Sequence, residues 1–234
     1  MSEHVAVTVS WGSRVESAAR CAERLLDSLN RLPAQDEIYS DWYVYPAGGA
    51  NGPDDLLPAP ADLDSLAALV DSTALKNNRG EVMSGGGFSP LLTRLHREGP
   101  VDYRVRCGVE RTRLGNHGLL KLPHPDHADP LANDETAIRD SLKALTEAWE
   151  PEYGAAMTYS FMQAQNVDDK AMEIPIGWLT YLANSVALDE SKLTELAQLT
   201  RVDGGIYLQL HGTPQEPSLD DALGVRRALG YAVR

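Results

Sequence analysis

The side chains best suited to hold a metal ion lie in one stretch of the sequence: His117, His124, Asp126 and His127. Imidazole and carboxylate groups are ligands that zinc prefers. However, a predicted strand at 119–122 separates His117 from the other three residues. Proline-rich acidic loops also often carry histidines without a metal. We therefore predict no metal site and no cofactor.

The two cysteines, Cys21 and Cys107, are candidate nucleophiles. Neither has a basic or histidine neighbour in the sequence, although His117 could approach Cys107 if their strands pair. Cys21 falls on the apolar face of a predicted helix and Cys107 in a predicted strand. We expect buried free thiols, as is usual in a reducing cytosol. A small enzyme that uses Cys107 and His117 stays open as an alternative.

Residues 190–192, Glu-Ser-Lys, have the E-x-K form of restriction-type nucleases. In such sites carboxylates hold Mg²⁺ and the lysine stabilises charge at the phosphate. Here the triplet opens a predicted helix instead of lying in a strand, and no acidic partner precedes it at short range. We interpret it as an exposed helix start.

The glycine triplet at 85–87 could be mistaken for a phosphate-binding loop, but it lacks the required lysine. We expect a hinge or a bare loop there. No nucleophile elbow, His-Glu-x-x-His or Walker motif occurs in the chain. The sequence therefore predicts a protein that is not an enzyme.

The chain is acidic, with 21 Lys and Arg against 34 Asp and Glu and a net charge of −13. This charge argues against direct binding to nucleic acid or to anionic membranes, and it permits a basic protein partner. Acidic residues in predicted loops are the candidate contacts: Asp54, Asp55, Asp168, Asp169 and Glu173. The alternative is that they are solvated loop charges.

The N-terminus is acidic where a signal peptide would be basic, and no apolar run is long enough to span a bilayer. We therefore expect a cytoplasmic protein.

Hydrophobic periodicity and turn residues predict an alternation of strands and helices. Strands are expected at 5–11, 37–45, 101–110, 119–122, 155–162, 176–182 and 205–210. Helices are expected from a capping box of Ser13 and Glu16 to 29, from Asp62, over 134–149 and 188–199, and from Ser218 onward. The order is roughly βαβα-ββα-ββαβα. Because strands cluster in pairs, we predict an α+β fold, with a mainly antiparallel sheet flanked by helices, in one domain over 1–234 with a possible hinge near 77–87.

The chain contains a series of short motifs built on aromatic residues, glycine and cysteine, which we call the landmarks. They are Trp11-Gly12 with Arg14 and Glu16, Cys21-Ala22, Trp42-Tyr43, Cys107-Gly108 with Asn116, Trp149-Glu150-Pro151-Glu152-Tyr153-Gly154, and Gly177-Trp178-Leu179-Thr180-Tyr181. In order and spacing they resemble the bacterial immunity protein 52 family of polymorphic toxin systems. Family members typically have proline where this chain has Ser13.

The resemblance implies a non-enzymatic antitoxin of a type VI secretion or related system. Such a protein binds a cognate secreted toxin, here expected to be a nuclease of restriction-endonuclease fold. A nuclease presents a basic groove to the phosphate backbone, and an acidic inhibitor can occupy it. An adaptor or chaperone that binds an effector without inhibiting it is the alternative from another class.

Overall fold

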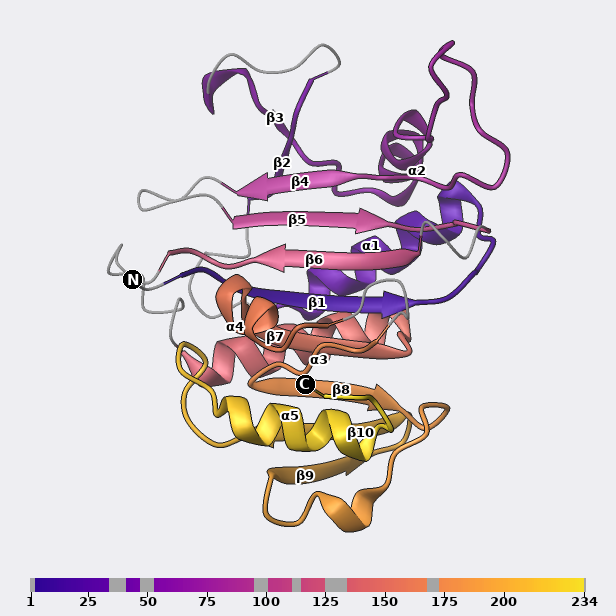
Figure 1. Cartoon of the computed structure of the whole chain (residues 1–234). Helices are drawn as coiled ribbons and strands as arrows, with labels where there is room; N and C mark the ends of the chain where they lie inside the picture. The colour runs from indigo at the N-terminus through magenta and orange to yellow at the C-terminus, as the bar shows by residue number, and fades with distance from the viewer. Residues whose placement is uncertain are drawn as a thin grey trace.

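The computed structural model describes residues 3–33, 41–46, 53–94, 101–110, 115–124, 134–167 and 173–233. Over these residues the chain forms an antiparallel sheet of ten strands in the order β3-β2-β4-β5-β6-β1-β7-β8-β10-β9 (Figure 1). The strands are β1 Val5–Trp11, β2 Tyr43–Val44, β3 Leu57–Pro58, β4 Leu91–Arg94, β5 Val101–Arg106, β6 Asn116–Lys121, β7 Tyr153–Thr158, β8 Leu179–Ala183, β9 Ala197–Val202 and β10 Gly205–Leu210. The α-helices are α1 Ala18–Arg31, α2 Leu63–Ser72, α3 Glu135–Trp149, α4 Tyr159–Ala164 and α5 Leu219–Ala228, with short 3₁₀ turns η1 Pro53–Asp55 and η3 Glu190–Lys192. The predicted α+β class is confirmed.

Helices cover the sheet on both faces. Figure 1 shows α1 and α3 behind the sheet and α5 in front of it. Neighbouring residues of β7 point into different cores: Ala156 packs with the α1 and α3 side, and Ala155 with the α4 and α5 side. This follows from the period of two along a strand. β7 therefore contributes to both cores.

Two predicted helix caps are confirmed, and the helix predicted over 134–149 begins after Asp134, which caps it. The Asp62 carboxylate accepts a hydrogen bond from the Ser65 amide at 2.9 Å, and Asp134 and Ser218 cap α3 and α5 in the same manner. In each case a short polar side chain satisfies a backbone amide that the first helical turn leaves unpaired.

The predicted capping box at Ser13 is wrong, because α1 starts at Ala18 with Ser17 as its cap. The Ser13 hydroxyl donates to the Glu110 carbonyl at 2.5 Å instead. The Glu16 carboxylate binds arginine side chains and does not reach back to the Ser13 amide. Contacts between distant segments therefore replace the local cap.

The helix predicted over 188–199 is also wrong. This segment forms η3 and then β9, which pairs with β10 in a hairpin. Pairing turns Ala197 toward the α5 side of the sheet, where it joins the buried cluster. Glu190 therefore opens a 3₁₀ turn, and the E-x-K triplet lies in no strand.

Other strand boundaries differ from the expected ones. β7 ends at Thr158, whose hydroxyl accepts from the Phe161 amide at 3.3 Å and starts α4 inside the predicted strand 155–162. Only Tyr43–Val44 of the strand predicted at 37–45 is assigned, and 34–40 lie outside the described residues. No helix in the described part of the chain is long and apolar enough to cross a membrane.

Candidate partner-binding surface

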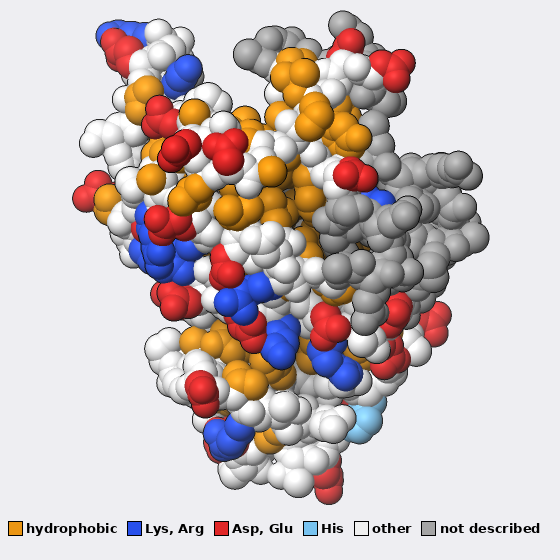
Figure 2. Space-filling model, turned by 180° about the vertical axis from the view of Figure 1, so that it is seen from behind, with side chains coloured by type: hydrophobic (Ala, Val, Ile, Leu, Met, Phe, Trp, Pro, Cys, Tyr) orange, Lys and Arg blue, Asp and Glu red, His pale blue; other side chains and the backbone are white. Residues whose placement is uncertain are grey.

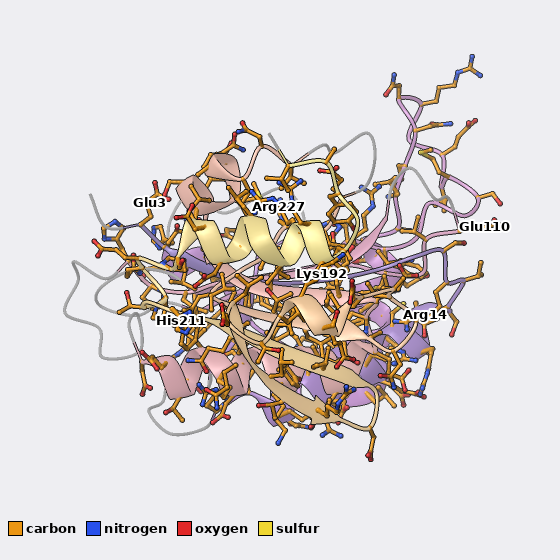
Figure 3. All side chains as sticks on the ribbon, turned by 60° about the horizontal axis from the view of Figure 1, so that its bottom comes forward. Glu3, Arg14, Glu110, Lys192, His211 and Arg227 are labelled. Atoms are coloured by element: carbon orange, nitrogen blue, oxygen red, sulfur yellow. The ribbon has the colours of Figure 1, made fainter. Side chains whose placement is uncertain are left out.

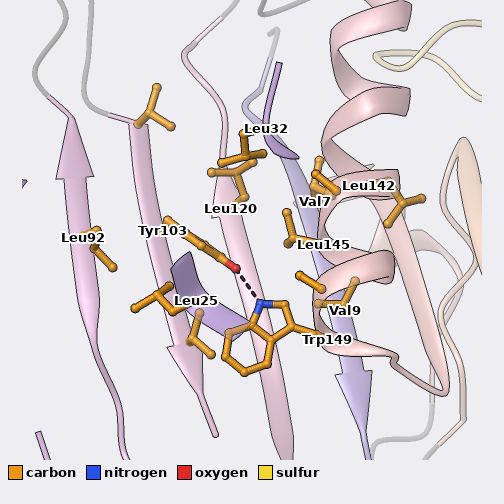
Figure 4. Close-up of a cluster of buried hydrophobic side chains, with 14 of the residues drawn as sticks. Val7, Val9, Leu25, Leu32, Leu92, Tyr103, Leu120, Leu142, Leu145 and Trp149 are labelled. Carbon is orange, nitrogen blue, oxygen red and sulfur yellow. Dashed lines mark hydrogen bonds between the residues drawn. The ribbon is translucent and has the colours of Figure 1, made fainter. Parts of the chain in front are cut away.

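Two of the family-like landmarks, Trp11 and Trp149, belong to a buried network, in which Figure 4 shows Trp149 hydrogen-bonded to Tyr103. The rings of Trp11 and Trp149 stack with centroids 5.1 Å apart. Trp149 Nε1 donates to the Tyr103 hydroxyl at 2.8 Å, which donates to the Ser28 hydroxyl at 2.9 Å. Burial raises the pKa of Tyr103, so its hydroxyl stays protonated. The network joins β1, α3, β5 and α1.

Ionic contacts reinforce the same junction. Glu16 accepts from Arg24 Nε at 2.8 Å and lies 3.2 Å from Arg14 Nε. Arg14 also donates to the Trp149 carbonyl at 2.9 Å and lies over the Trp11 ring. Arg24 donates to the Ala148 carbonyl at 2.8 Å. Both arginines therefore bind the C-terminal carbonyls of α3, where the helix dipole favours cations.

The glycine and asparagine landmarks have structural explanations too. Gly108 has φ of +70°, and a Cβ there would lie 2.9 Å from the Glu16 carbonyl oxygen. The Asn116 side chain donates to the Gly12 carbonyl at 2.6 Å and accepts from the Val109 amide at 2.9 Å. We conclude that these landmark residues help to build the scaffold.

The predicted burial of both thiols is confirmed, since Cys21 and Cys107 are free and fully buried. A hydrogen bond with Cys21, together with burial, raises the pKa of Cys107, which disfavours the nucleophilic thiolate. His117 pairs with Arg106 across β5 and β6, so strand alternation directs it to the face opposite Cys107. The structure does not bring these two side chains together.

The candidate zinc ligands are only partly described. His124 packs edge-on against the ring of His4, with centroids 4.9 Å apart. Asp126 and His127 lie outside the described residues. Within the residues that the structure describes, no group of three or more His, Cys, Asp or Glu side chains could hold a metal ion.

The five predicted partner contacts fall in different environments. Asp54 and Asp55 lie in η1 with exposed side chains. Glu173 is only 13% exposed and forms an ion pair with the buried Arg226, so its carboxylate neutralises a cation inside the protein. Asp168 and Asp169 lie outside the described residues.

A wider acidic segment surrounds Asp54 and Asp55. Residues 32–75 hold eight of the 34 acidic residues and none of the 21 basic ones, so they account for −8 of the net charge of −13. All described members are exposed: Asp41, Asp54, Asp55, Asp62, Asp64 and Asp71. The absence of Lys and Arg could have been noticed in the sequence alone. We call residues 41–46 and 53–72 of this segment the acidic end.

Hydrophobic side chains are also exposed on the acidic end. Tyr45 is 47% exposed, Leu57 53% and Leu63 37%. Figure 2 shows hydrophobic side chains gathered at this end, with carboxylates around them. An apolar patch rimmed by charge of one sign is typical of a surface that binds a partner of opposite charge.

Beside the acidic end, residues 74–88 project from the body as an arm (Figures 1 and 2). The Leu75 amide donates to the Gly87 carbonyl at 3.0 Å, and the Met83 amide to the Leu75 carbonyl at 2.8 Å. Lys76 and Val82 form a further bridge. The stretch expected to be a hinge or a bare loop is therefore a hydrogen-bonded hairpin.

A groove of about 920 Å³ lies elsewhere, between α3 and the strands β8, β10 and β9. The rings of Tyr181 and Tyr207 in its lining are 5.2 Å apart. Burial raises the pKa of Tyr207 to about 12, and its hydroxyl shares a hydrogen bond of 2.6 Å with Thr146. The Tyr207 phenol is therefore neutral at physiological pH, which argues against a role as a base.

Comparisons with known proteins agree with this scaffold. A family model described as immunity protein 52 matches residues 5–188. The match defines the class of the protein as an immunity protein. The chain belongs to the immunity protein 52 family, as the resemblance of its landmarks predicts.

Among solved structures, a type VI secretion protein of Pseudomonas aeruginosa, titled T6SS protein PA0821, is similar in fold. Its TM-score is 0.52 at 13% sequence identity, and the alignment covers 97% of this chain and 72% of that one. The comparison with curated proteins gave no match.

Proposed function

We propose that this protein is a non-enzymatic immunity protein that binds and neutralises a cognate toxin of a type VI secretion system in the cytoplasm. The family match over residues 5–188 carries the proposal. The buried free thiols are compatible with a reducing compartment. The fold similarity to a protein titled as part of that secretion system is consistent with the setting.

We further propose that the toxin is a nuclease of restriction-endonuclease fold. Such an enzyme needs a basic groove for the phosphate backbone and carboxylates that hold a divalent metal ion. The acidic end offers the opposite charge to that groove, and its exposed Tyr45, Leu57 and Leu63 offer apolar area for a desolvated contact. Charge of opposite sign also speeds the encounter.

Asp54 and Asp55 are the contacts proposed first, because they are exposed on the acidic end. Asp168 and Asp169 remain proposed contacts on sequence grounds. Glu173 is the weakest of the five, since an interface that recruited it would have to compete with Arg226.

Co-expression with the toxin encoded by the neighbouring gene tests the proposal. The chain should restore growth and should copurify with the toxin. Failure to rescue would remove the immunity function. Binding to a toxin segment outside the toxic domain, without rescue, would favour the adaptor alternative. Rescue that disappears in Cys107→Ala, with folding intact, would favour an enzyme.

A further inference from the structure

We infer that the arm carries Arg79 into the metal-binding centre of the toxin, where its guanidinium pairs with the carboxylates that otherwise hold the divalent ion. The inference rests on the proposed function. It assigns the arm to the bottom of the nuclease groove and the acidic end to the basic rim of that groove.

The tip of the arm is ordered by one side chain. Asn77 Oδ1 accepts from the amides of Arg79 at 2.8 Å and Glu81 at 3.1 Å. Asn77 Nδ2 donates to Glu81 Oε2 at 2.8 Å. Gly80 takes φ of +80°, which favours glycine, and donates to the Asn77 carbonyl at 2.9 Å. A tip with its own hydrogen bonds loses little conformational entropy when it binds.

The base of the arm is fixed to the sheet. Phe88 and Cys107 exchange backbone hydrogen bonds of 2.8 and 3.1 Å, and the Glu110 amide donates to the Gly85 carbonyl at 3.1 Å. Beyond this base, residues 76–82 are all exposed, and Val82 is 65% exposed. The arm is thus a supported projection with an apolar side chain directed at solvent, and a concave partner would bury it.

The charge at the tip of the arm indicates which kind of partner surface it can bind. The exposed stretch 76–82 carries two cations, Lys76 and Arg79, and one anion, Glu81, so its net charge is +1. Arg79 forms no ion pair among the residues that the structure describes, and the Glu81 carboxylate is turned to the Asn77 amide. Arg79 therefore presents a cation from a projection next to the acidic end, whose segment 32–75 contains no basic residue. A partner complementary to this surface is basic where it faces the acidic end and acidic where it meets the tip of the arm.

A nuclease centre has this charge profile. Lysines and arginines line the phosphate groove, and carboxylates gather around the metal ion within it. A guanidinium matches a carboxylate with two parallel hydrogen bonds, and a desolvated pair of this kind is strong. Arg79 and the divalent ion would then compete for the same carboxylates.

The test measures binding of the purified toxin, without nucleic acid, while Mg²⁺ is titrated at constant ionic strength. Wild-type affinity should fall as Mg²⁺ rises. Arg79→Ala should weaken binding by about 30-fold without Mg²⁺, as expected for an arginine at the centre of an interface. The same variant should lose the dependence on Mg²⁺.

Two further variants complete the design. Arg227→Ala, an exposed arginine on α5 away from the arm (Figure 3), should bind as the wild type does. Asn77→Ala keeps the guanidinium but releases the tip. It should weaken binding by a smaller factor, retain the Mg²⁺ dependence and leave the melting temperature unchanged.

The alternative outcomes are distinct. Wild-type affinity for Arg79→Ala would overturn the inference. The inference would also be overturned if wild-type binding did not depend on Mg²⁺, or if the dependence persisted in Arg79→Ala. In either case, rescue of growth by the wild type would still support the immunity function. A wild type that neither binds nor rescues would instead remove the proposed function.

Discussion

At the scale of single residues, the tryptophan landmarks of this chain lie in one of its two cores. Trp178 is fully buried, and its Nε1 donates to the Gly212 carbonyl at 3.3 Å. A Cβ at the preceding Gly177 would lie 2.4 Å from the Ala156 carbonyl oxygen, so only glycine fits. The prediction that these residues are structural is supported by their burial.

Trp178→Ala should destabilise the protein by about 3–5 kcal/mol, because the substitution leaves a large cavity in a packed core. Urea unfolding measures the change, and Tyr159→Ala, at a side chain that is 68% exposed, is the control. A loss of less than about 1 kcal/mol for Trp178→Ala would contradict the role of the ring as a core anchor.

His117 should titrate below its ordinary pKa of 6.5, because burial and the adjacent Arg106 disfavour the charged ring. The unfolded chain then binds this proton more tightly than the folded protein does. Stability contributed by the neutral ring is present above pH 6.5 and is lost as the pH falls through the folded pKa.

Proton NMR of the imidazole across pH measures that pKa, and Arg106→Gln should raise it. His117→Gln should reduce the pH dependence of the free energy of unfolding below pH 6.5. A pKa at or above 6.5 in the wild type would show that burial and Arg106 do not act on the ring as described.

At the scale of elements, local signals were reliable where the element depends on its own residues. Asp62 and Ser218 cap helices as predicted, because a cap needs only a side chain and the first helical turn. The signals failed where distant segments compete. The periodic leucines around 188–199 suit a helix, but pairing with β10 and burial of Ala197 make the segment a strand.

Ser17→Ala should destabilise α1 by about 1 kcal/mol, since the hydroxyl accepts from the Arg20 amide. Ser13→Ala should cost less, because it removes one hydrogen bond from an exposed loop. Thermal and urea unfolding of both variants measure the two losses of stability. The opposite ranking would show that the hydrogen bond from Ser13 to Glu110 contributes more to stability than the Ser17 cap does.

At the scale of the whole molecule, charge is segregated in a way that composition does not reveal. Asp54 and Asp55 could be selected from the sequence as partner contacts, but the extent of the acidic end required the structure, which pairs β2 with β3 and packs residues of α2 and β2 into the same core. The arm was missed because its glycines suggest a hinge, whereas Asn77 and the bridge from Lys76 to Val82 order it. Glu173 was predicted as a partner contact because it looks like a loop carboxylate in the sequence. Its ion pair with Arg226 cannot be inferred from sequence spacing.

Reversing Asp54 and Asp55 to lysine should slow association with the toxin and weaken the salt dependence of the on-rate, with little change in melting temperature. Surface plasmon resonance across a salt series measures this. The matched control reverses Asp203 and Glu195, which are exposed on the β9 side of the molecule. Equal on-rates for the Asp54/Asp55 variant and the wild type would place the interface elsewhere.

The central position of β1 has a consequence for when protection begins. Its partners β6 and β7 start at Asn116 and Tyr153. The first strand to be synthesised therefore cannot pair on both sides until the ribosome has made both neighbours. At the usual rate of translation, roughly 7–30 s separate β1 from β7. On the proposed function, a chain whose synthesis begins when the toxin arrives can complete the sheet around β1 only after this delay.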